Sequence, residues 1–224
     1  MASEQKRRGR PRILDDAAIL DSALRVFAVH GYEGMSLRSL NSELGLSHGT
    51  INQRFGTKEQ LYLEAVDHGF SGLLADMRSI VESEPLPGDP LDELQMRFRA
   101  FLLASARRPH LNRLINNEGV APSPMLDHIF EQYIAPAMRV TTKLMRRLAD
   151  DGVIDPVPER TVLFVLANGA GGMFSLPALA AKFDPVDGPL DPEAASDAMA
   201  AMIVEGMRRH SSRGRSRRGS SSQA

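Results

Sequence analysis

The 224-residue sequence lacks cysteine altogether. This absence excludes disulfide bonds and metal sites built from thiolates, and it fits the reducing cytoplasm, where we expect the protein to work. The first residues are basic and no apolar run follows them, so we expect no secretory signal peptide. Apolar residues still make up 42% of the chain, which is enough for a packed core and argues against wholesale disorder.

Recognisable catalytic patterns are also missing. The six histidines are scattered without the paired spacing of metal ligands, and there is no Gly-x-Ser-x-Gly nucleophile elbow. The glycine-rich segment 168–172 follows no strand pattern and is not closed by Lys-Ser or Lys-Thr, so a phosphate loop is not expected there. We therefore expect no catalytic residue, no metal ligand and no cofactor, and we expect that the protein is not an enzyme.

One uncharged segment, residues 161–181, is long enough on paper to span a bilayer. It contains an asparagine, three glycines and a proline, and an acidic, proline-rich stretch follows it. A helix buried against other parts of the protein has the same composition. We expect no contact with a membrane, and a membrane span remains the alternative.

Charge is distributed unevenly, although the net charge is only −1. Residues 1–58 carry nine Lys or Arg against six Asp or Glu, and residues 208–224 carry six Arg and no acid. Residues 59–207 carry twelve basic against twenty-two acidic side chains. These blocks indicate that the ends meet a polyanion while the middle has another role. Charge alone does not identify the polyanion.

Apolar residues recur at helical spacing almost throughout, and no run alternates as a strand would. The sequence predicts an all-α fold of about nine helices. The first helix has one apolar stripe, and His30-Gly31 is expected to end this helix. Proline and glycine cut the chain beyond residue 81 into five further helical stretches, the last being residues 192–209. The members of the first stripe are Leu20, Ala23, Leu24, Phe27 and Ala28.

Residues 36–55 have the pattern of a helix-turn-helix. Ser36 is expected to cap a short helix that Gly45 breaks, and Ser47 is expected to cap the next helix. Thr57 and Gln60 form a capping box for a fourth helix that runs to about residue 81. The inner face of the short helix is expected to be Leu37, Leu40 and Leu44.

Two short helices joined by a glycine turn form a compact element that fits a DNA major groove. Gly49 would let the second helix approach DNA closely, and Ser47 would offer its hydroxyl to a phosphate. Asparagine and glutamine can pair with adenine, and arginine with guanine. The alternative is that these are ordinary polar residues on a solvated helix. The remaining candidates are Thr50, Asn52, Gln53 and Arg54 for bases, and Lys58 for a phosphate.

About fifty consecutive residues resemble the DNA-binding segment of the tetracycline-repressor (TetR) family. The similarity runs through segments 19–28, 30–33, 36–40 and 45–51, then Phe55 and segment 58–61. It covers roughly a quarter of the chain, in the right order and spacing. The resemblance implies a three-helix helix-turn-helix DNA-binding domain, followed by a helical ligand-binding and dimerisation domain.

On this resemblance, we expect a homodimer that binds double-stranded DNA and an unidentified small-molecule effector. It implies a DNA-binding domain at 13–72 and a second domain at 73–210. The composition of the two ends predicts a basic disordered arm at 1–12 and a disordered basic tail at 211–224. Two departures matter: Asn52 replaces a usual tyrosine, and Asn41 and Leu44 replace usual alanines. The implied phosphate or base contacts are Ser47, His48, Gly49, Thr50, Gln53, Arg54 and Lys58.

The basic arm holds five cations within residues 6–12. Its Arg-Gly-Arg-Pro core resembles the AT-hook, whose arginines enter narrow A·T minor grooves, and this implies DNA contacts from Arg10 and Arg12. The alternative is a generic basic arm that adds only non-specific attraction to DNA. The arginines of the C-terminal tail are interpreted as keeping that end soluble, and the alternative is that they add non-specific attraction to DNA.

The second domain shows no local motif. Its apolar side chains could enclose a ligand pocket, or they could simply pack as a core. By resemblance, residues 161–181 and 192–209 would pair across a dimer axis as a four-helix bundle. The effector-binding residues remain unknown. The aromatic and apolar candidates are Phe98, Phe101, Leu102, Phe130, Tyr133, Leu163, Phe164, Met173 and Phe174.

The predicted function is sequence-specific DNA binding by a transcriptional regulator. We expect a repressor that a small-molecule effector releases from an inverted-repeat operator. A DNA-binding module whose second domain only dimerises is one alternative. An enzyme or a membrane-associated helical protein is another.

Overall fold

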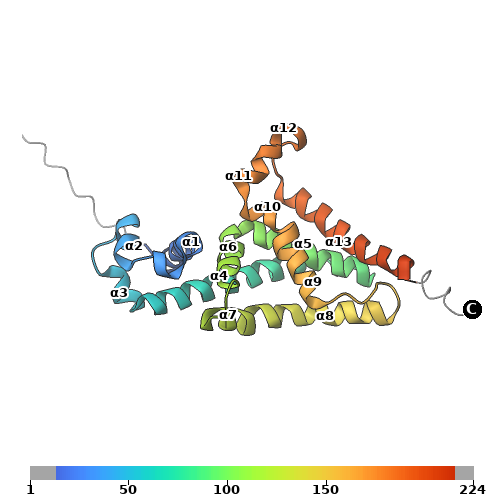
Figure 1. Ribbon diagram of the computed structural model, residues 1–224, viewed down its shortest axis with the longest axis horizontal. Helices are drawn as coiled ribbons and strands as arrows, with labels where there is room; N and C mark the ends of the chain where they lie inside the picture. Colours follow the sequence, from blue (N-terminus) through green and yellow to red (C-terminus); the bar gives the residue numbers. More distant parts are fainter. Residues whose placement is uncertain (1–13, 215–224) are drawn as a thin grey trace, which may run out of the picture. The chain divides into compact units, whose positions relative to one another are not determined.

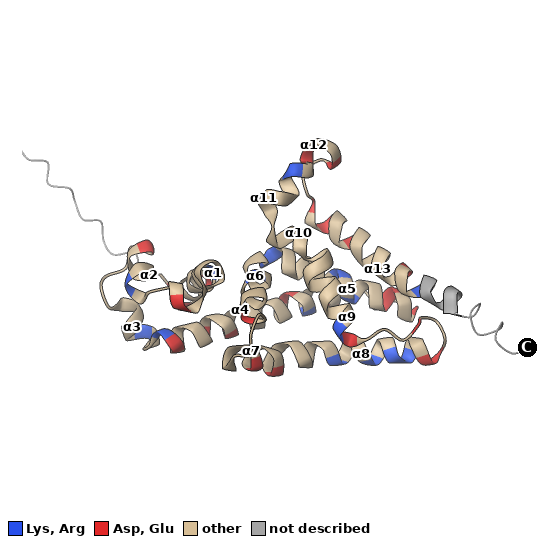
Figure 2. Ribbon diagram, viewed as in Figure 1, with Lys and Arg blue, Asp and Glu red and all other residues tan. Residues whose placement is uncertain are grey.

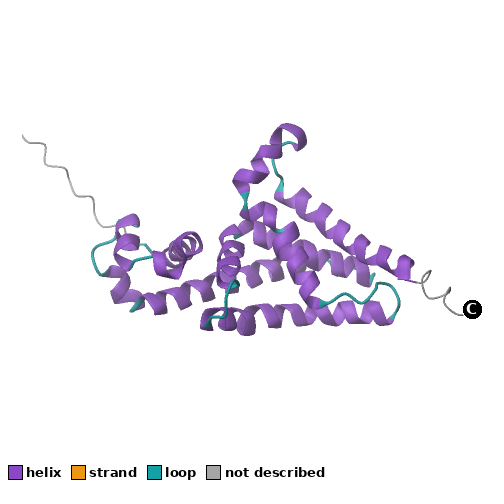
Figure 3. Ribbon diagram, in the orientation of Figure 1, coloured by secondary structure: helices purple, strands orange, loops and turns teal. Residues whose placement is uncertain are grey.

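The computed structural model describes residues 14–214 (Figure 1). Helices dominate this stretch and none of its residues lies in a strand (Figure 3). The predicted all-α class is therefore confirmed. The chain divides into two compact units, Met1–Gly69 and Phe70–Ala224. Arg10, Arg12 and the last ten residues of the predicted tail lie outside the described residues.

The first unit contains α1 (Asp16–Gly34), α2 (Leu37–Glu43), α3 (Thr50–Phe55) and the beginning of α4 (Lys58–Glu82). Asp15 caps α1, because its side chain accepts a hydrogen bond from the backbone N–H of Ala18 at 2.8 Å. The backbone leaves the helical conformation at Gly31, where φ is +71°, as the sequence predicts. The capping box of α4 is also confirmed: Thr57 N–H donates to Gln60 Oε1 at 2.8 Å, and Gln60 N–H to Thr57 Oγ1 at 3.2 Å.

The core of the first unit lies among α1 to α4. Its buried side chains include Ile19, Leu24 and Phe27 of α1, Leu40 of α2, Ile51 and Phe55 of α3, and Leu61 of α4. Two predicted details are wrong. Ile19 is buried in place of Leu20, which is half-buried, and α2 buries Leu40 and Asn41 while Leu37 and Leu44 are half-buried. The other expected members of the α1 stripe, Ala23, Leu24, Phe27 and Ala28, are buried as predicted.

The second unit consists of helices of very different lengths. Its longer helices are α5 (Pro90–Arg107), α6 (Pro109–Glu118), α8 (Ala135–Asp150) and α13 (Pro192–Gly214). The short ones are α7 (Pro124–Ile129), α9 (Glu159–Phe164), α10 (Gly172–Ser175), α11 (Pro177–Ala180) and α12 (Asp184–Asp187). Two π-helical segments, η1 (Phe130–Ile134) and η2 (Val165–Ala170), and the 3₁₀ turn η3 (Ala181–Phe183) complete it.

The helix count depends on these π-helical segments. Segment η1 joins α7 to α8 in one rod, and η2 lies between α9 and α10 (Figure 1). The sequence predicts one helix for each of these two stretches, because apolar spacing does not distinguish a π turn from the α-helix around it. Helix α13 continues to Gly214, beyond residue 209 where the sequence places its end.

The core of the second unit forms where α5 packs against α8 and α13. Three residues expected at a pocket, Phe98, Leu102 and Phe174, lie in this core, with Phe101 and Met173 packed against it. Phe130 and Phe164 are instead exposed. For the buried members, core packing is the interpretation that the structure favours. The remaining core side chains include Leu144, Met145, Leu148, Val162, Leu166, Ala200, Val204 and Met207.

A search for membrane-spanning helices within residues 14–214 found no helix with the length and apolar content to cross a bilayer.

Candidate nucleic-acid interface

Helix α2 and the turn after it form the first half of the candidate interface. Ser36 caps α2, since its Oγ accepts a hydrogen bond from the backbone N–H of Ser39 at 3.0 Å. The chain turns at Gly45, where φ is +65°, a conformation that favours glycine. The turn closes when Leu46 N–H donates to the carbonyl of Asn41 at 2.9 Å. Both the Ser36 cap and the break at Gly45 agree with the sequence prediction.

Asn41 joins the two helices of the motif. Its side chain is buried between them, with only 3% of the residue exposed. The amide Nδ2 donates to the carbonyl of Leu37 in α2 at 2.9 Å, and Oδ1 accepts from the backbone N–H of Ile51 in α3 at 3.3 Å. The first N–H groups of a helix have no partner within that helix. Asn41 therefore supplies one of these partners from the preceding helix.

The start of α3 differs from the prediction. Ser47 was expected to cap this helix, but the residue that precedes α3 is Gly49, with φ at +84° and no capping side chain. The Ser47 hydroxyl instead lies 2.6 Å from the hydroxyl of Thr50. An added Cβ at Gly49 would meet nothing within 4 Å, so glycine is required here by the backbone conformation.

Helix α3 separates an apolar face from a polar one. Ile51 and Phe55 are buried against the unit, while Asn52 and Gln53 are exposed. Ser47 and His48, just before the helix, are exposed as well. Asn52 Nδ2 donates to the carbonyl of Gly56 at 3.4 Å. In place of the usual tyrosine, this position thus holds a short amide that contacts the end of its own helix.

Arg54 is held by the beginning of α1. Its Nε donates to Asp16 Oδ1 at 2.7 Å, its Nη1 donates to the carbonyl of Leu14 at 2.6 Å, and Nη2 also pairs with Asp16. These bonds link residues about forty positions apart in the sequence. They fix α3 against the point where the basic arm joins the first helix.

Lys58 rests on an aromatic cluster. Its Nζ lies 4.4 Å from the centre of the Tyr32 ring and 3.5 Å from the carbonyl of Glu33. Tyr32 packs against Tyr62 with ring centres 5.2 Å apart, and Tyr62 packs against Phe27 at 4.3 Å. An ammonium over an aromatic face is attracted by the ring quadrupole. The cluster therefore restricts where the Lys58 charge can lie.

The predicted contact residues fall into three groups. Ser47, His48, Asn52 and Gln53 are exposed, Gly49 and Thr50 are half-buried, and Arg54 and Lys58 are engaged within the unit. Residues 14–69 carry four basic against eight acidic side chains, and both signs occur along these helices (Figure 2). Most of the positive charge of the N-terminal segment thus belongs to residues 6–12.

Sequence reasoning missed the structural roles of Asn41, Asp16 and Tyr32. The position of Asn41 directly after Leu40 in α2 was a usable signal, because a buried amide requires partners. For Asp16 and Tyr32 no local signal exists, since their partners lie far along the chain.

Comparison with protein families gives two matches. Residues 19–65 match the family of bacterial regulatory proteins named tetR, and residues 87–167 match the C-terminal domain of the HTH-type transcriptional dual regulator CecR. The first match contains all of α2 and α3. The second falls in the unit that begins at Phe70.

Several curated relatives are similar over parts of the chain. The HTH-type transcriptional regulator YezE of Bacillus subtilis is 31% identical over 128 residues, which is 55% of this chain and 64% of YezE. The repressor ComR of Escherichia coli is 40% identical over 63 residues, 28% of this chain and 30% of ComR. The repressor AcnR of Corynebacterium efficiens is 51% identical over 45 residues, 20% of this chain and 24% of AcnR. The chain thus spans less than two thirds of the length of each of these three relatives.

Solved structures share the fold over most of the chain. The ketosteroid transcriptional regulator KstR2 of Mycobacterium tuberculosis has a TM-score of 0.65 at 19% identity, covering 90% of this chain and 99% of KstR2. AibR in complex with isovaleryl coenzyme A and operator DNA has a TM-score of 0.60 at 20% identity, covering 83% of this chain and 95% of AibR. The relatives named here are regulators, in agreement with the prediction that the chain is not an enzyme. Residues 19–65 thus match the tetR family of bacterial regulatory proteins, and the chain shares the fold of solved TetR-family regulators over most of its length.

Proposed function

We propose that this protein is a sequence-specific DNA-binding transcriptional regulator that contacts a major groove with α3. The observation that carries the proposal is the division of α3: Ile51 and Phe55 anchor it to the core, while Asn52 and Gln53 face outward. A helix that is fixed on one face and polar on the other suits a groove. Asn41 strengthens the proposal, since it fixes α3 to α2 through a buried hydrogen bond.

The contacts divide into base and phosphate contacts. Gln53, Asn52 and Thr50 carry the donors and acceptors for base edges, while Ser47, His48 and Lys58 contact phosphates. Gly49 has no side chain, so the start of α3 can come close to the DNA. Arg54 contacts DNA with a guanidinium already oriented by Asp16. Arg10 and Arg12 of the arm enter the minor groove.

The regulator acts as a homodimer. Along α9 and η2, Phe164 is 57% and Val165 is 41% exposed, and on α13 Met202 is 63% exposed. Large apolar side chains that remain exposed in one chain are candidates for an interaction face. Ala194 and Ala198, also exposed on α13, would let a partner helix approach closely. In such a dimer, the two α3 helices enter successive major grooves about 34–36 Å apart.

A small-molecule effector releases the dimer from its operator. Several relatives are named repressors, and AibR was solved with both isovaleryl coenzyme A and operator DNA. For release, the effector must bind the DNA-free geometry more tightly than the DNA-bound one. This protein has the second unit that such an effector would occupy.

A DNA-binding module without an effector is the second candidate function. It is favoured by the second unit's core, in which Phe98, Leu102 and Phe174 are buried. A compound library distinguishes the two: an effector raises the melting temperature and weakens operator binding together. If no compound does both, the module without an effector is the better description.

Selection of genomic fragments by the purified full-length protein tests DNA recognition itself. We expect enrichment of one inverted repeat, and footprinting should show two protected half-sites one helical turn apart. Gln53→Ala should lose the enrichment while remaining folded. If wild-type protein enriches no sequence over bulk fragments, the proposal is wrong.

A further inference from the structure

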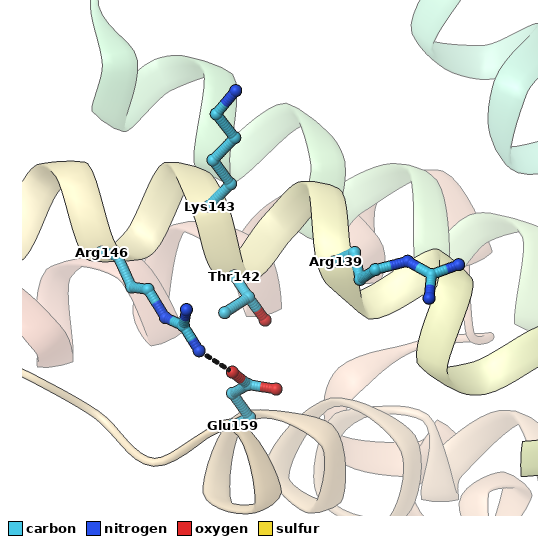
Figure 4. Close-up of a pocket in the computed structure, with 5 residues that line it drawn as sticks. All are labelled: Arg139, Thr142, Lys143, Arg146 and Glu159. Atoms are coloured by element: carbon cyan, nitrogen blue, oxygen red, sulfur yellow. Dashed lines mark hydrogen bonds and ion pairs between the residues drawn. The ribbon is translucent and has the colours of Figure 1, made fainter. Parts of the chain in front are cut away.

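Helix α8 carries three closely spaced basic residues. Arg139, Lys143 and Arg146 are spaced by four and three residues, so they occupy neighbouring positions along the helix surface. All three are exposed, and Figure 2 shows basic segments along this helix. With Thr142 and with Glu159 of α9 they line an open hollow of about 320 Å³ (Figure 4).

The charges of this hollow are only partly balanced. Arg146 pairs with Glu159 at 2.8 Å. Arg139 and Lys143 form no hydrogen bond or ion pair with any residue of the described part of the chain. Two positive charges thus remain uncompensated beside a third, although like charges this close on a helix repel one another. A bound anion would remove that repulsion.

Thr142 adds an independent observation. Only 7% of this residue is exposed, and its Oγ1 is buried without a hydrogen-bond partner among the described residues. Its oxygen points toward the space between Arg139 and Glu159 (Figure 4). A buried hydroxyl without a partner is costly, and a bound acceptor recovers that cost. The side chains of Arg146 and Glu159 are 76% and 50% exposed, so their weak ion pair can move aside and admit an anion.

We propose that this hollow binds the phosphate or pyrophosphate group of a small molecule, and we call it the α8 anion site (Arg139, Thr142, Lys143 and Arg146). Guanidinium groups match the geometry of phosphate oxygens through paired N–H donors, and the threonine hydroxyl adds a neutral donor. Lys143 points away from Thr142 in Figure 4, so it contributes at the rim. A singly charged ligand would leave part of this charge unbalanced, whereas pyrophosphate would not.

The α8 anion site lies wholly within the second unit and does not depend on the proposed DNA-binding function. Its test therefore uses full-length protein without DNA. Calorimetric titration with sodium pyrophosphate should show saturable binding of one ion per chain, with weaker binding of orthophosphate. Sodium chloride at equal ionic strength should show none. A parallel titration with ADP distinguishes a carried pyrophosphate group from the free ion: both should bind, and ADP should bind more tightly only if its nucleoside is also contacted.

Variants distinguish specific binding at the α8 anion site from non-specific attraction of anions to the basic protein surface. Arg139→Gln should weaken pyrophosphate binding about tenfold, because one charged partner is lost. Thr142→Val should weaken it as well, while leaving the melting temperature of the free protein unchanged or raised, since the unpartnered hydroxyl is removed. The matched control is Arg147→Gln, an exposed arginine of the same helix outside the hollow, which should bind like wild type.

Three results would overturn the proposal. The first is that pyrophosphate binds no better than sodium chloride. The second is that Arg139→Gln or Thr142→Val binds pyrophosphate with wild-type affinity. The third is that Arg147→Gln loses as much affinity as Arg139→Gln. Because the two exposed arginines can be replaced without disturbing the core, the comparison does not depend on whether Thr142→Val folds. Failure to find an operator would leave this result unaffected.

Discussion

The side chain of Asn41 accepts a hydrogen bond from the backbone N–H of Ile51 at 3.3 Å, across the turn of the helix-turn-helix motif. The same amide donates to Leu37 within its own helix. Both groups are buried, so the bond cannot be exchanged for one to water. This one buried side chain therefore links α2 to α3.

Asn41→Ala should destabilise the protein by about 1–3 kcal/mol, because the Ile51 N–H is left buried without its partner. Chemical denaturation followed by circular dichroism measures this change in the free energy of unfolding. The control is Asn52→Ala on the exposed face of α3, which should change it by less than about 0.5 kcal/mol. Equal stability of the two variants would show that the Asn41 bond does not hold the motif together.

Gln53→Ala should reduce discrimination between the operator and a single-base variant by about 1–3 kcal/mol, since an exposed donor and acceptor pair is removed from α3. Binding to both duplexes is measured by fluorescence anisotropy at one fixed salt concentration. Glu64→Gln, an exposed change on α4, serves as the control and should retain discrimination. A uniform loss of affinity for all duplexes would instead assign Gln53 to the phosphates.

Lys58→Ala should weaken binding to every duplex about equally and reduce the slope of log K against log salt by about 1. The position of its ammonium over Tyr32 adds a second test. Tyr32→Phe keeps the aromatic face and should behave like wild type, while Tyr32→Leu should show part of the Lys58→Ala effect. A change in base preference alone in Lys58→Ala would contradict the phosphate assignment.

Local features of the first unit could be predicted from sequence, and long-range pairings could not. The Ser36 cap, the break at Gly45 and the box of Thr57 and Gln60 depend on residues within three or four positions, where residue type decides the geometry. The Ser47 cap was wrong because the chain reaches the left-handed conformation at Gly49 before α3 begins.

Pairings across the fold explain the remaining misses. Arg54 meets Asp16 only because α1 and α3 pack together, and nothing in either segment specifies the other. In the second unit, apolar spacing located the helices but not which apolar residues are exposed. Phe98 and Phe164 look alike in sequence, yet one is in the core and the other is on the surface.

Removal of residues 2–12 should lower the salt slope of DNA binding by up to about 4–5, because each of five cations displaces close to one counterion from DNA. Residues 14–69 carry a net negative charge, so the electrostatic attraction to DNA depends on the basic arm. Removal of residues 215–224 is the control and should have the smaller effect, in keeping with a solubilising tail. Substitution of Arg10 and Arg12 by Gln in the full chain should in addition weaken preference for A·T-rich flanks. If the flanks do not matter, the arm contributes only non-specific attraction.

Phe164→Glu should convert the proposed dimer to a monomer at micromolar concentration. Phe164 is more than half exposed on α9, within the face that we propose for the dimer, and a carboxylate there would be buried without a partner in the dimer. Sedimentation equilibrium measures the change in mass. Val140→Glu is the matched control, because Val140 is similarly exposed but belongs to α8, outside the proposed dimer face. The monomeric variant should bind a single half-site with greatly reduced affinity, since the second half-site no longer adds to the first. A Phe164→Glu protein that remains dimeric would place the dimer face elsewhere on the second unit.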